Sequence, residues 1–216
     1  MPVLFSGWDV VDDGASLPAE KLGVSQFPRK GRVYIMYHGT TVDNARHIIT
    51  EGFLQSSGGM LGKGVYVSRD INKAAVYPRH HPSTDRVVLE LRVRPGRVKR
   101  IANDNDLQFD WHANRYNTAW VPANCGLSAA PAGMEEDCVF NPRRVMVVGI
   151  AKAPDNGVQS ELQQLVDSMM PGAGDGAAVK CSLCKRKTQH GAQHINQQCW
   201  KCGKNICILA TKHFCP

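Results

Sequence analysis

The sequence predicts an α+β domain followed by a small cysteine-rich module. Helical patterns lie early in the main part of the chain, and β-prone runs dominate its later part. Six of the eight cysteines fall within the last 36 residues, behind a glycine-rich stretch. These observations indicate one sizeable core and a separate appended module.

The composition fits an enzyme-sized domain. The 216 residues are 43% hydrophobic, which suffices for one core of roughly 140 to 170 residues. No stretch reaches the roughly 18 apolar residues that a membrane span needs, and the N-terminal residues lack the pattern of a secretion signal. We therefore expect an intracellular protein, cytoplasmic rather than nuclear, with no membrane partner.

The net charge of +7 lies in the tail. Seven of the 26 Lys and Arg residues, and none of the 19 acidic residues, lie in 179–216, so residues 1–178 carry 19 groups of each sign. The main domain thus has no electrostatic preference for polyanions, and any attraction for nucleic acid resides in the tail.

A strand, a polar turn and a helix open the main domain. Residues 1–31 show little periodicity, so an irregular lead-in is expected there. A β-prone run at 33–37 ends in His38-Gly39-Thr40, and residues 42–49 have helical spacing behind a Thr cap.

A glycine-rich loop and a second strand and helix follow. The loop spans 56–64, the strand 65–67, and the helix, which Ser68 can cap, is expected to run to about Tyr77. Further strands are predicted at 86–93, 139–140 and 145–150. The expected domains are a lead-in at 1–31, the main domain at 32–154, a helix and Gly-rich linker at 155–178, and a cysteine-rich module at 179–216.

Four short motifs, taken in order, resemble the catalytic domain of the poly(ADP-ribose) polymerases. That family shows HG(S/T), a helix with a glycine near its end, G-x-G-(I/V)-Y-(F/V), and K-x-x-x-Y. The corresponding residues here are His38 to Thr40, Glu51 to Phe53, Gly62 to Ser68, and Lys73 to Tyr77. The resemblance extends through residues 86–93 and 135–140 and covers roughly residues 30–152. It implies the family fold of split antiparallel sheets with flanking helices, and NAD+ as the substrate.

Two further patterns are similar to those of interferon-inducible fish proteins named for their induction by grass carp reovirus. The patterns are N-T-A-W-V-P-x-N-C-G at 117–126 and E-E-D-C-V-(F/W) at 135–140. This resemblance implies a role in innate antiviral defence.

The resemblance also implies roles for single residues. The backbone of Gly39 would hydrogen-bond the nicotinamide amide, the rings of Tyr66 and Tyr77 would enclose the nicotinamide, and His38 would hold the adenosine-side ribose. Aromatic stacking contributes about 0.5–1.5 kcal/mol per face beyond burial. The expected NAD+-binding residues are His38, Gly39, Thr40, Tyr66, Ser68, Lys73 and Tyr77.

The transfer of ADP-ribose from NAD+ that the resemblance implies needs a carboxylate beside the ribose. Cleavage of the N-glycosidic bond passes through a sugar cation, which the carboxylate stabilises. The resemblance gives this role to Glu136, which precedes an aromatic-rich strand; Glu135 is the alternative, since strand alternation turns only one of two neighbours into a cleft. A second alternative is that both are solvated loop acids. The expected catalytic residues are Glu136, His38 and Tyr66.

One residue departs from the family pattern. Ala74 stands where the polymerases have a serine that contacts nicotinamide, which removes a hydrogen bond of about 0.5–1.5 kcal/mol. We predict an NAD+-dependent ADP-ribosyltransferase that modifies a macromolecular acceptor. The alternatives are a catalytically inactive module that binds NAD+ or ADP-ribose, and a different reaction on a related fold, such as RNA 2′-phosphotransfer.

The tail has the spacing of a zinc site. Cys181-x-x-Cys184 and Cys199-x-x-Cys202 are separated by 14 intervening residues, which lets two knuckles converge on one tetrahedral ion. Paired knuckles and a late Cys/His cluster are similar to the C-terminal fingers of piggyBac-type transposases. A second ion could take ligands from Cys207, His213 and Cys215, with His190 or His194 as further candidates, so one or two Zn2+ ions are expected.

The sequence leaves two classes of partner open for this tail, nucleic acid and protein. Its lysines, together with Trp200 as a stacking platform, suit nucleic acid. The same lysines would equally solvate a metal module that contacts a protein.

Overall fold

In the computed structural model, side chains are described for residues 18–104, 106–130, 133–169 and 202–203. Only the backbone is described for 2–3, 196–198, 205–207 and 213–214. Pro18–Met169 forms a compact unit that is distinct from the flanking residues. The fold below is that of this unit.

The larger sheet has four strands in the order β2-β3-β5-β9. β3, β5 and β9 are antiparallel, and β2 joins the edge of β3 in parallel. The strands are β2 Ala19–Lys21, β3 Val33–Thr41, β5 Arg86–Val93 and β9 Val145–Lys152. The region expected to be an irregular lead-in thus contains a strand. Its three residues are too few to show the alternation of polar and apolar residues that predicts a strand.

The second sheet also has four strands, in the order β4-β8-β7-β6. β8 is antiparallel to both neighbours, and β6 is parallel to β7. The strands are β4 Val65–Val67, β8 Glu136–Val139, β7 Thr118–Val121 and β6 Val98–Arg100. The predicted α+β class, with two separate sheets, is confirmed for these residues.

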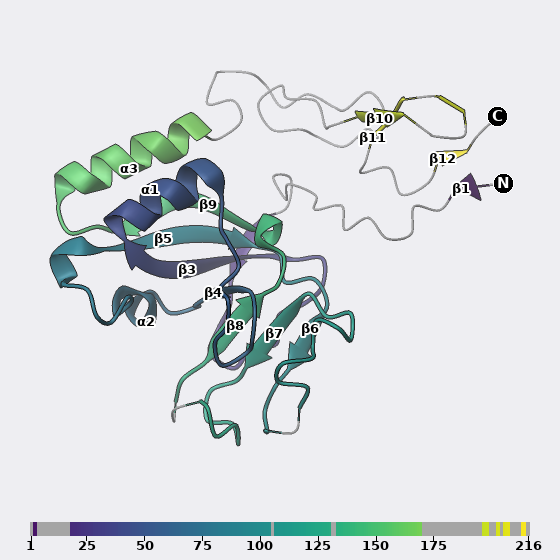
Figure 1. The fold of residues 1–216 in the computed structure, drawn as a ribbon, viewed down its shortest axis with the longest axis horizontal. Helices are drawn as coiled ribbons and strands as arrows, with labels where there is room; N and C mark the ends of the chain where they lie inside the picture. The colour runs from purple at the N-terminus through teal and green to yellow at the C-terminus, as the bar shows by residue number, and fades with distance from the viewer. Residues whose placement is uncertain are drawn as a thin grey trace. The chain divides into compact units, whose positions relative to one another are not determined.

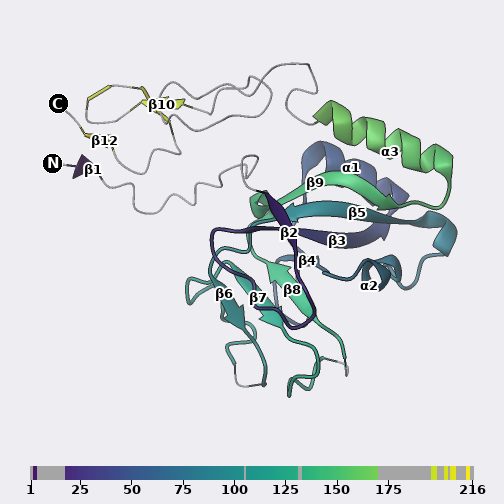
Figure 2. The same cartoon turned by 180° about the vertical axis from the view of Figure 1, so that it is seen from behind.

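Three α-helices flank the larger sheet. α1 Val42–Glu51 and α3 Asn156–Met169 lie on one side of it, and α2 Ile71–Ala75 lies on the other (Figures 1 and 2). Short 3-10 turns occupy Ser83–Asp85 and Pro142–Arg144. None of the described helices has the length and apolarity to cross a bilayer.

The N-terminal cap predicted for α1 is confirmed, and the one predicted for α2 is wrong. Thr41 caps α1 as expected, with its Oγ1 3.2 Å from the amide nitrogen of Asn44. The cap of α2 is Asp70 rather than Ser68, because the Asp70 carboxylate accepts from the Asn72 amide at 2.8 Å. The Ser68 hydroxyl instead donates to the Asp70 carbonyl at 3.0 Å.

The helix expected in a connector after residue 155 is an integral part of the unit. Leu162 and Val166 of α3 are buried. The Arg46 guanidinium on α1 donates to both carboxylate oxygens of Glu161, at 2.7 and 3.0 Å. The apolar face of α3 therefore packs against α1 and the larger sheet.

A second core lies beneath the smaller sheet. Its fully buried members are Leu61, Ile101, Trp111, Ala119, Val121, Leu127 and Cys138. The Trp111 indole donates to the Leu61 carbonyl at 2.8 Å. The end of the glycine-rich loop is thus fixed to this core.

Most of the predicted zinc ligands lie outside the described residues. These are Cys181, Cys184, Cys199 and Cys215, while Cys207 and His213 are described by backbone alone. In the tail, β10 Asn196–Gln198 pairs with β11 Asn205–Cys207, and β12 His213–Phe214 pairs with β1 Pro2–Val3. The described residues contain no group of three His, Cys, Asp or Glu side chains placed to hold a metal. The zinc site stays a prediction from spacing.

Candidate active site

The two sheets meet where β3 passes the end of β4. Tyr37 and Ser68 exchange backbone hydrogen bonds of 2.7 and 2.8 Å. Next to this junction, the Nδ1 atom of His38 lies 2.8 Å from the carbonyl oxygen of Tyr66. The motifs around His38 and Tyr66, which are 28 residues apart, are therefore joined at one point.

A cleft of about 720 Å³ opens beside this junction. Its volume lies within the range that small-molecule and cofactor sites occupy. Its lining includes every residue for which a catalytic or NAD+-binding role was predicted, namely His38, Gly39, Thr40, Tyr66, Ser68, Lys73, Tyr77 and Glu136. Their roles stay predictions, but the four chain segments that carry them share one cleft.

Gly39 has no room for a side chain. A Cβ on this residue would overlap the carbonyl oxygen of Ala74 and would lie 3.0 Å from that of Tyr77. Since the Ala74 carbonyl cannot shift without its helix, the glycine is what lets the end of α2 lie against β3. The same close approach brings Tyr77 to the cleft.

The protonation of His38 follows from its contacts. A carbonyl oxygen only accepts, so Nδ1 carries the proton that bonds to Tyr66, and Nε2 is the acceptor of the neutral ring. Burial lowers the pKa of His38, which keeps the imidazole neutral at pH 7. Phe53 supports the ring edge-on, with centroids 5.1 Å apart.

The Tyr66 hydroxyl is bonded to the glycine-rich loop. It accepts from the Leu61 amide at 2.9 Å and donates to the Gly62 carbonyl at 2.8 Å. A Cβ on Gly59 would lie 2.5 Å from the same hydroxyl, so the loop folds closely over it. Burial raises the pKa of Tyr66 far above its usual range. The phenol therefore stays protonated, and the ring is what Tyr66 offers to a ligand.

Tyr77 is oriented by Arg79. The guanidinium carbon lies 5.1 Å from the ring centroid, and Nη2 donates to the Tyr77 hydroxyl at 3.2 Å. Both contacts come from a residue only two positions further along the chain. They fix the plane of a ring that lines the cleft.

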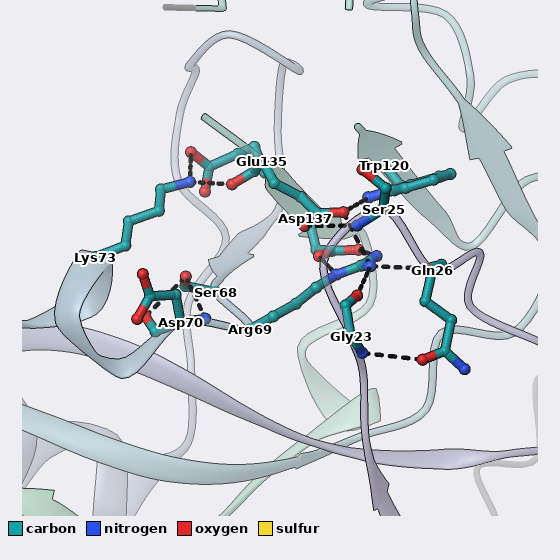
Figure 3. Close-up of polar contacts among 11 residues, drawn as sticks. Gly23, Ser25, Gln26, Ser68, Arg69, Asp70, Lys73, Trp120, Glu135 and Asp137 are labelled. Atoms are coloured by element: carbon teal, nitrogen blue, oxygen red, sulfur yellow. Dashed lines mark hydrogen bonds and ion pairs between the residues drawn. The ribbon is translucent and has the colours of Figure 1, made fainter. Parts of the chain in front are cut away.

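The structure separates the two neighbouring glutamates. The Glu136 carboxylate lines the cleft and lies 2.8 Å from the Lys73 Nζ atom, and Lys73 also donates to the Glu135 carbonyl. The Glu135 carboxylate turns the other way, toward Arg69 and Trp120 (Figure 3). Both side chains are largely shielded from solvent, 11% exposed for Glu135 and 14% for Glu136, so the alternative of two solvated loop acids is wrong.

Burial and Lys73 act on Glu136 in opposite directions. Burial raises the pKa of this carboxyl above its ordinary value, and the Lys73 ammonium partly offsets that increase. A carboxylate with little water around it interacts strongly with positive charge that develops nearby. The position suits the stabilisation of a sugar cation.

One wall of the cleft was not anticipated from the sequence. The solvent-facing side of α1 contributes Asn44, His47, Ile48 and Glu51. The spacing of three or four residues puts these side chains on one helical face. The apolar period of this helix predicts its core-facing side, and the polar residues of the opposite face carry no signal of a cleft.

Comparison with known families agrees with this geometry. Residues 19–119 match the family model of the poly(ADP-ribose) polymerase catalytic domain. No curated protein sequence matches the chain. The matched range holds His38, Tyr66, Lys73 and Tyr77 and ends before Glu136. The match suggests ADP-ribosyltransferase chemistry in general, which in this family uses NAD+ as the substrate.

Proposed function

We propose that the chain is an NAD+-dependent ADP-ribosyltransferase that modifies a macromolecular acceptor. One observation carries the proposal: the cleft brings two tyrosine rings, a neutral histidine and a buried carboxylate together from four segments of the chain. These are the groups that a nicotinamide, a ribose and a developing sugar cation require.

Binding would use the flat and neutral groups of the cleft. The nicotinamide ring would lie against Tyr66 and Tyr77, with its amide at the backbone of Gly39. The acceptor nitrogen Nε2 of His38 suits a ribose hydroxyl. Because the Tyr66 hydroxyl already has two protein partners, its contribution is stacking.

The chemistry would fall on Glu136. When the bond between ribose and nicotinamide breaks, its electron pair leaves with nicotinamide and positive charge develops on the sugar. The Glu136 carboxylate would stabilise that charge and accept the proton of the attacking acceptor hydroxyl. Lys73, 2.8 Å away, favours the ionised form that both tasks need.

Incubation with labelled NAD+ tests the proposal. Glu136→Gln should lower transfer about 10²- to 10³-fold while NAD+ binding persists, since only charge stabilisation is lost. Tyr66→Ala should lose binding as well as transfer. Glu161→Gln, an exposed carboxylate outside the cleft, should transfer at the wild-type rate. Full activity of Glu136→Gln, or no label on any acceptor, would contradict the proposal.

A second candidate is an inactive module that binds NAD+ or ADP-ribose. Two features favour it: Lys73 already engages one Glu136 oxygen, and Ala74 lacks the hydroxyl that the polymerases have at this position. Calorimetry separates the candidates, because heat of NAD+ binding without release of nicotinamide would identify the inactive module.

For the tail we propose a zinc finger that selects a protein or nucleic acid partner. The spacing supports Cys181, Cys184, Cys199 and Cys202 around one ion, and thiolates are a donor set that structural zinc takes. Cys207, His213 and Cys215 are the proposed ligands of a second ion. Metal analysis should find one or two zinc ions per chain and fewer in Cys184→Ser. Zinc content unchanged by that substitution would contradict the ligand assignment.

We further propose that the protein acts inside the cell, in the cytoplasm, in an antiviral response. The support is the resemblance of residues 117–126 and 135–140 to the interferon-inducible fish proteins. Induction of the transcript by interferon in cells of the source organism would test this proposal. A transcript level that does not change would contradict it.

A further inference from the structure

Arg69 is a buried cation that no predicted role accounts for. It lies between β4 and α2, and its side chain is 4% exposed. Nε and Nη2 donate to the two Asp137 carboxylate oxygens at 2.8 and 3.1 Å. Nη1 donates to the carbonyls of Gly23 and Gln26 at 3.1 and 2.6 Å and lies 2.9 Å from Glu135 Oε1. Every nitrogen of the guanidinium therefore has a partner.

These partners lie on both sides of the carboxylate proposed for catalysis. Glu135 and Asp137 flank Glu136, and strand alternation turns them to the face opposite the cleft. Figure 3 shows Arg69 and Lys73 approaching this acidic run from different directions. Arg69 binds the two outer carboxylates, and Lys73 binds the middle one.

Further bonds hold Glu135 away from the cleft. Its Oε1 atom accepts from the Trp120 indole at 2.6 Å, and Oε2 accepts from the Ser25 amide at 3.3 Å. The Arg69 guanidinium also lies over the Trp120 ring, 4.9 Å from its centroid. The segment from Gly23 to Gln26 thus closes the network from outside.

The planar guanidinium of Arg69, which donates two parallel hydrogen bonds to Asp137, matters because the start of β8 could otherwise pair in a different register. A one-residue slip of a strand turns every side chain to the other face, which would point Glu135 and Asp137 into the cleft. A bidentate guanidinium fixes direction as well as charge, whereas a point charge does not. Asp137, with a side chain only 3% exposed, requires a partner on that face.

We propose that Arg69 is a positioning residue, which holds Glu135 and Asp137 on the outer face and thereby keeps Glu136 in the cleft beside Lys73. The backbone carbonyls of Gly23 and Gln26 complete its hydrogen bonds. The effect on transfer rests on the proposed function, but the positioning of Glu136 does not.

The variants are made in the full chain. Arg69→Met alone leaves Asp137 buried and unpaired, so Arg69→Met is combined with Asp137→Asn, and Arg69→Lys keeps the charge without the fork. The matched control combines Arg46→Met with Glu161→Gln, which removes another bidentate pair between two elements, and neither of its residues bonds to the acidic run. Thermal unfolding confirms that each protein is folded.

The first readout does not need activity. Carboxyl NMR follows the titration of Glu136 with and without Lys73→Met. In the otherwise unaltered chain, Lys73→Met should raise the pKa of Glu136, because the ammonium lowers it. In the double variant of Arg69 and Asp137, Lys73→Met should leave that pKa unchanged, since the two groups no longer meet. An equal shift in both backgrounds overturns the proposal.

The second readout is the division between kcat and KM. The double variant should lose about 10- to 100-fold in kcat while KM for NAD+ changes less than about threefold, because small displacements of a reacting group act on the chemical step. Arg69→Lys should be intermediate. A kcat equal to that of the matched control overturns the proposal. If the wild-type protein transfers no label, the proposed function fails, and the titration still decides the role of Arg69.

Discussion

Two walls of the cleft, the α2 wall and the glycine-loop wall, are built by different means. On the α2 wall, backbone lies directly against backbone, because Gly39 leaves no space before the carbonyls of Ala74 and Tyr77. The glycine-loop wall is held by side chains that reach its backbone. The Trp111 indole bonds to the Leu61 carbonyl, and the Gln108 amide bonds to the Met60 carbonyl at 2.7 Å.

The difference teaches where the cleft can adapt to a ligand. The α2 wall cannot move without displacing β3, the central part of the larger sheet. The loop wall is fixed at residues 60–62 by hydrogen bonds that can be removed one at a time. Leu54, which lines the cleft and is 88% exposed, lies just before this loop. Adjustment to a bound ligand should therefore concentrate in the loop wall rather than in the α2 wall.

The largest effect on stability is expected from Gly39→Ala. The added methyl group overlaps backbone that cannot yield alone, so we expect a loss of at least about 3 kcal/mol in the free energy of unfolding, together with loss of NAD+ binding. Urea unfolding and calorimetry measure both. Gly149→Ala is the control, because a Cβ there would lie 3.6 Å from its nearest neighbour, Gln163. Equal stability of the two variants would show that the α2 wall is not rigid.

A smaller effect is expected from Trp111→Phe. The substitution leaves the buried Leu61 carbonyl without its indole partner, which should cost about 1–3 kcal/mol of stability. Because this bond belongs to the loop wall, NAD+ affinity should fall while the fold persists. Urea unfolding and NAD+ titration measure these changes. An unaltered NAD+ affinity would show that the Trp111 hydrogen bond does not influence the cleft.

Tyr66→Phe should have a smaller effect than Trp111→Phe. It removes the hydroxyl that pairs with Leu61 and Gly62 and keeps the ring, so a loss of about 1–2 kcal/mol of stability is expected. Transfer should stay within a few-fold of the wild-type rate, unlike in Tyr66→Ala. A rate as low as that of Tyr66→Ala would show that the phenol itself takes part in the reaction.

The smallest effect on stability is expected from pH, through Glu136. Burial raises the pKa of this carboxyl above its ordinary value of 4.5, so transfer should fall as the pH decreases through that raised value. The sign for stability is opposite: a folded pKa above the unfolded one favours the folded state at low pH, and this contribution is lost as the pH rises. Rate and melting temperature recorded together between pH 4 and 8 test both. An activity loss only below pH 4.5 would contradict the expected shift.

The sequence predicted the elements that carry local patterns. The start of β3, the Thr41 cap of α1 and the amphipathic spacing of α3 each follow from residues close together in the chain. The polar turn expected at 38–40 is wrong, because β3 continues through Thr41 and these residues pair with β5. Motif order also predicted which residues line the cleft. Thr118–Val121 was not predicted as a strand, because all four residues are buried and no alternation marks them.

The orientation of the acidic run could not be predicted. Strand alternation indicated that only one of Glu135 and Glu136 faces the cleft, but the choice depends on Arg69, which lies more than 60 residues earlier. An arginine between a short strand and a short helix has no local feature that distinguishes it from a solvated surface residue. Its carboxylate partners become evident only when β4 and β8 pair.

The hydrogen bond between His38 and Tyr66 makes the hydrogen-bonding character of this part of the cleft insensitive to mild acidification. The Nδ1 proton of His38 is donated to a carbonyl, and burial lowers the pKa of the ring. The imidazole therefore does not gain a second proton when the pH falls slightly below neutrality. The His38 side of the cleft should therefore offer a ligand the same acceptor nitrogen at neutral pH and slightly below it.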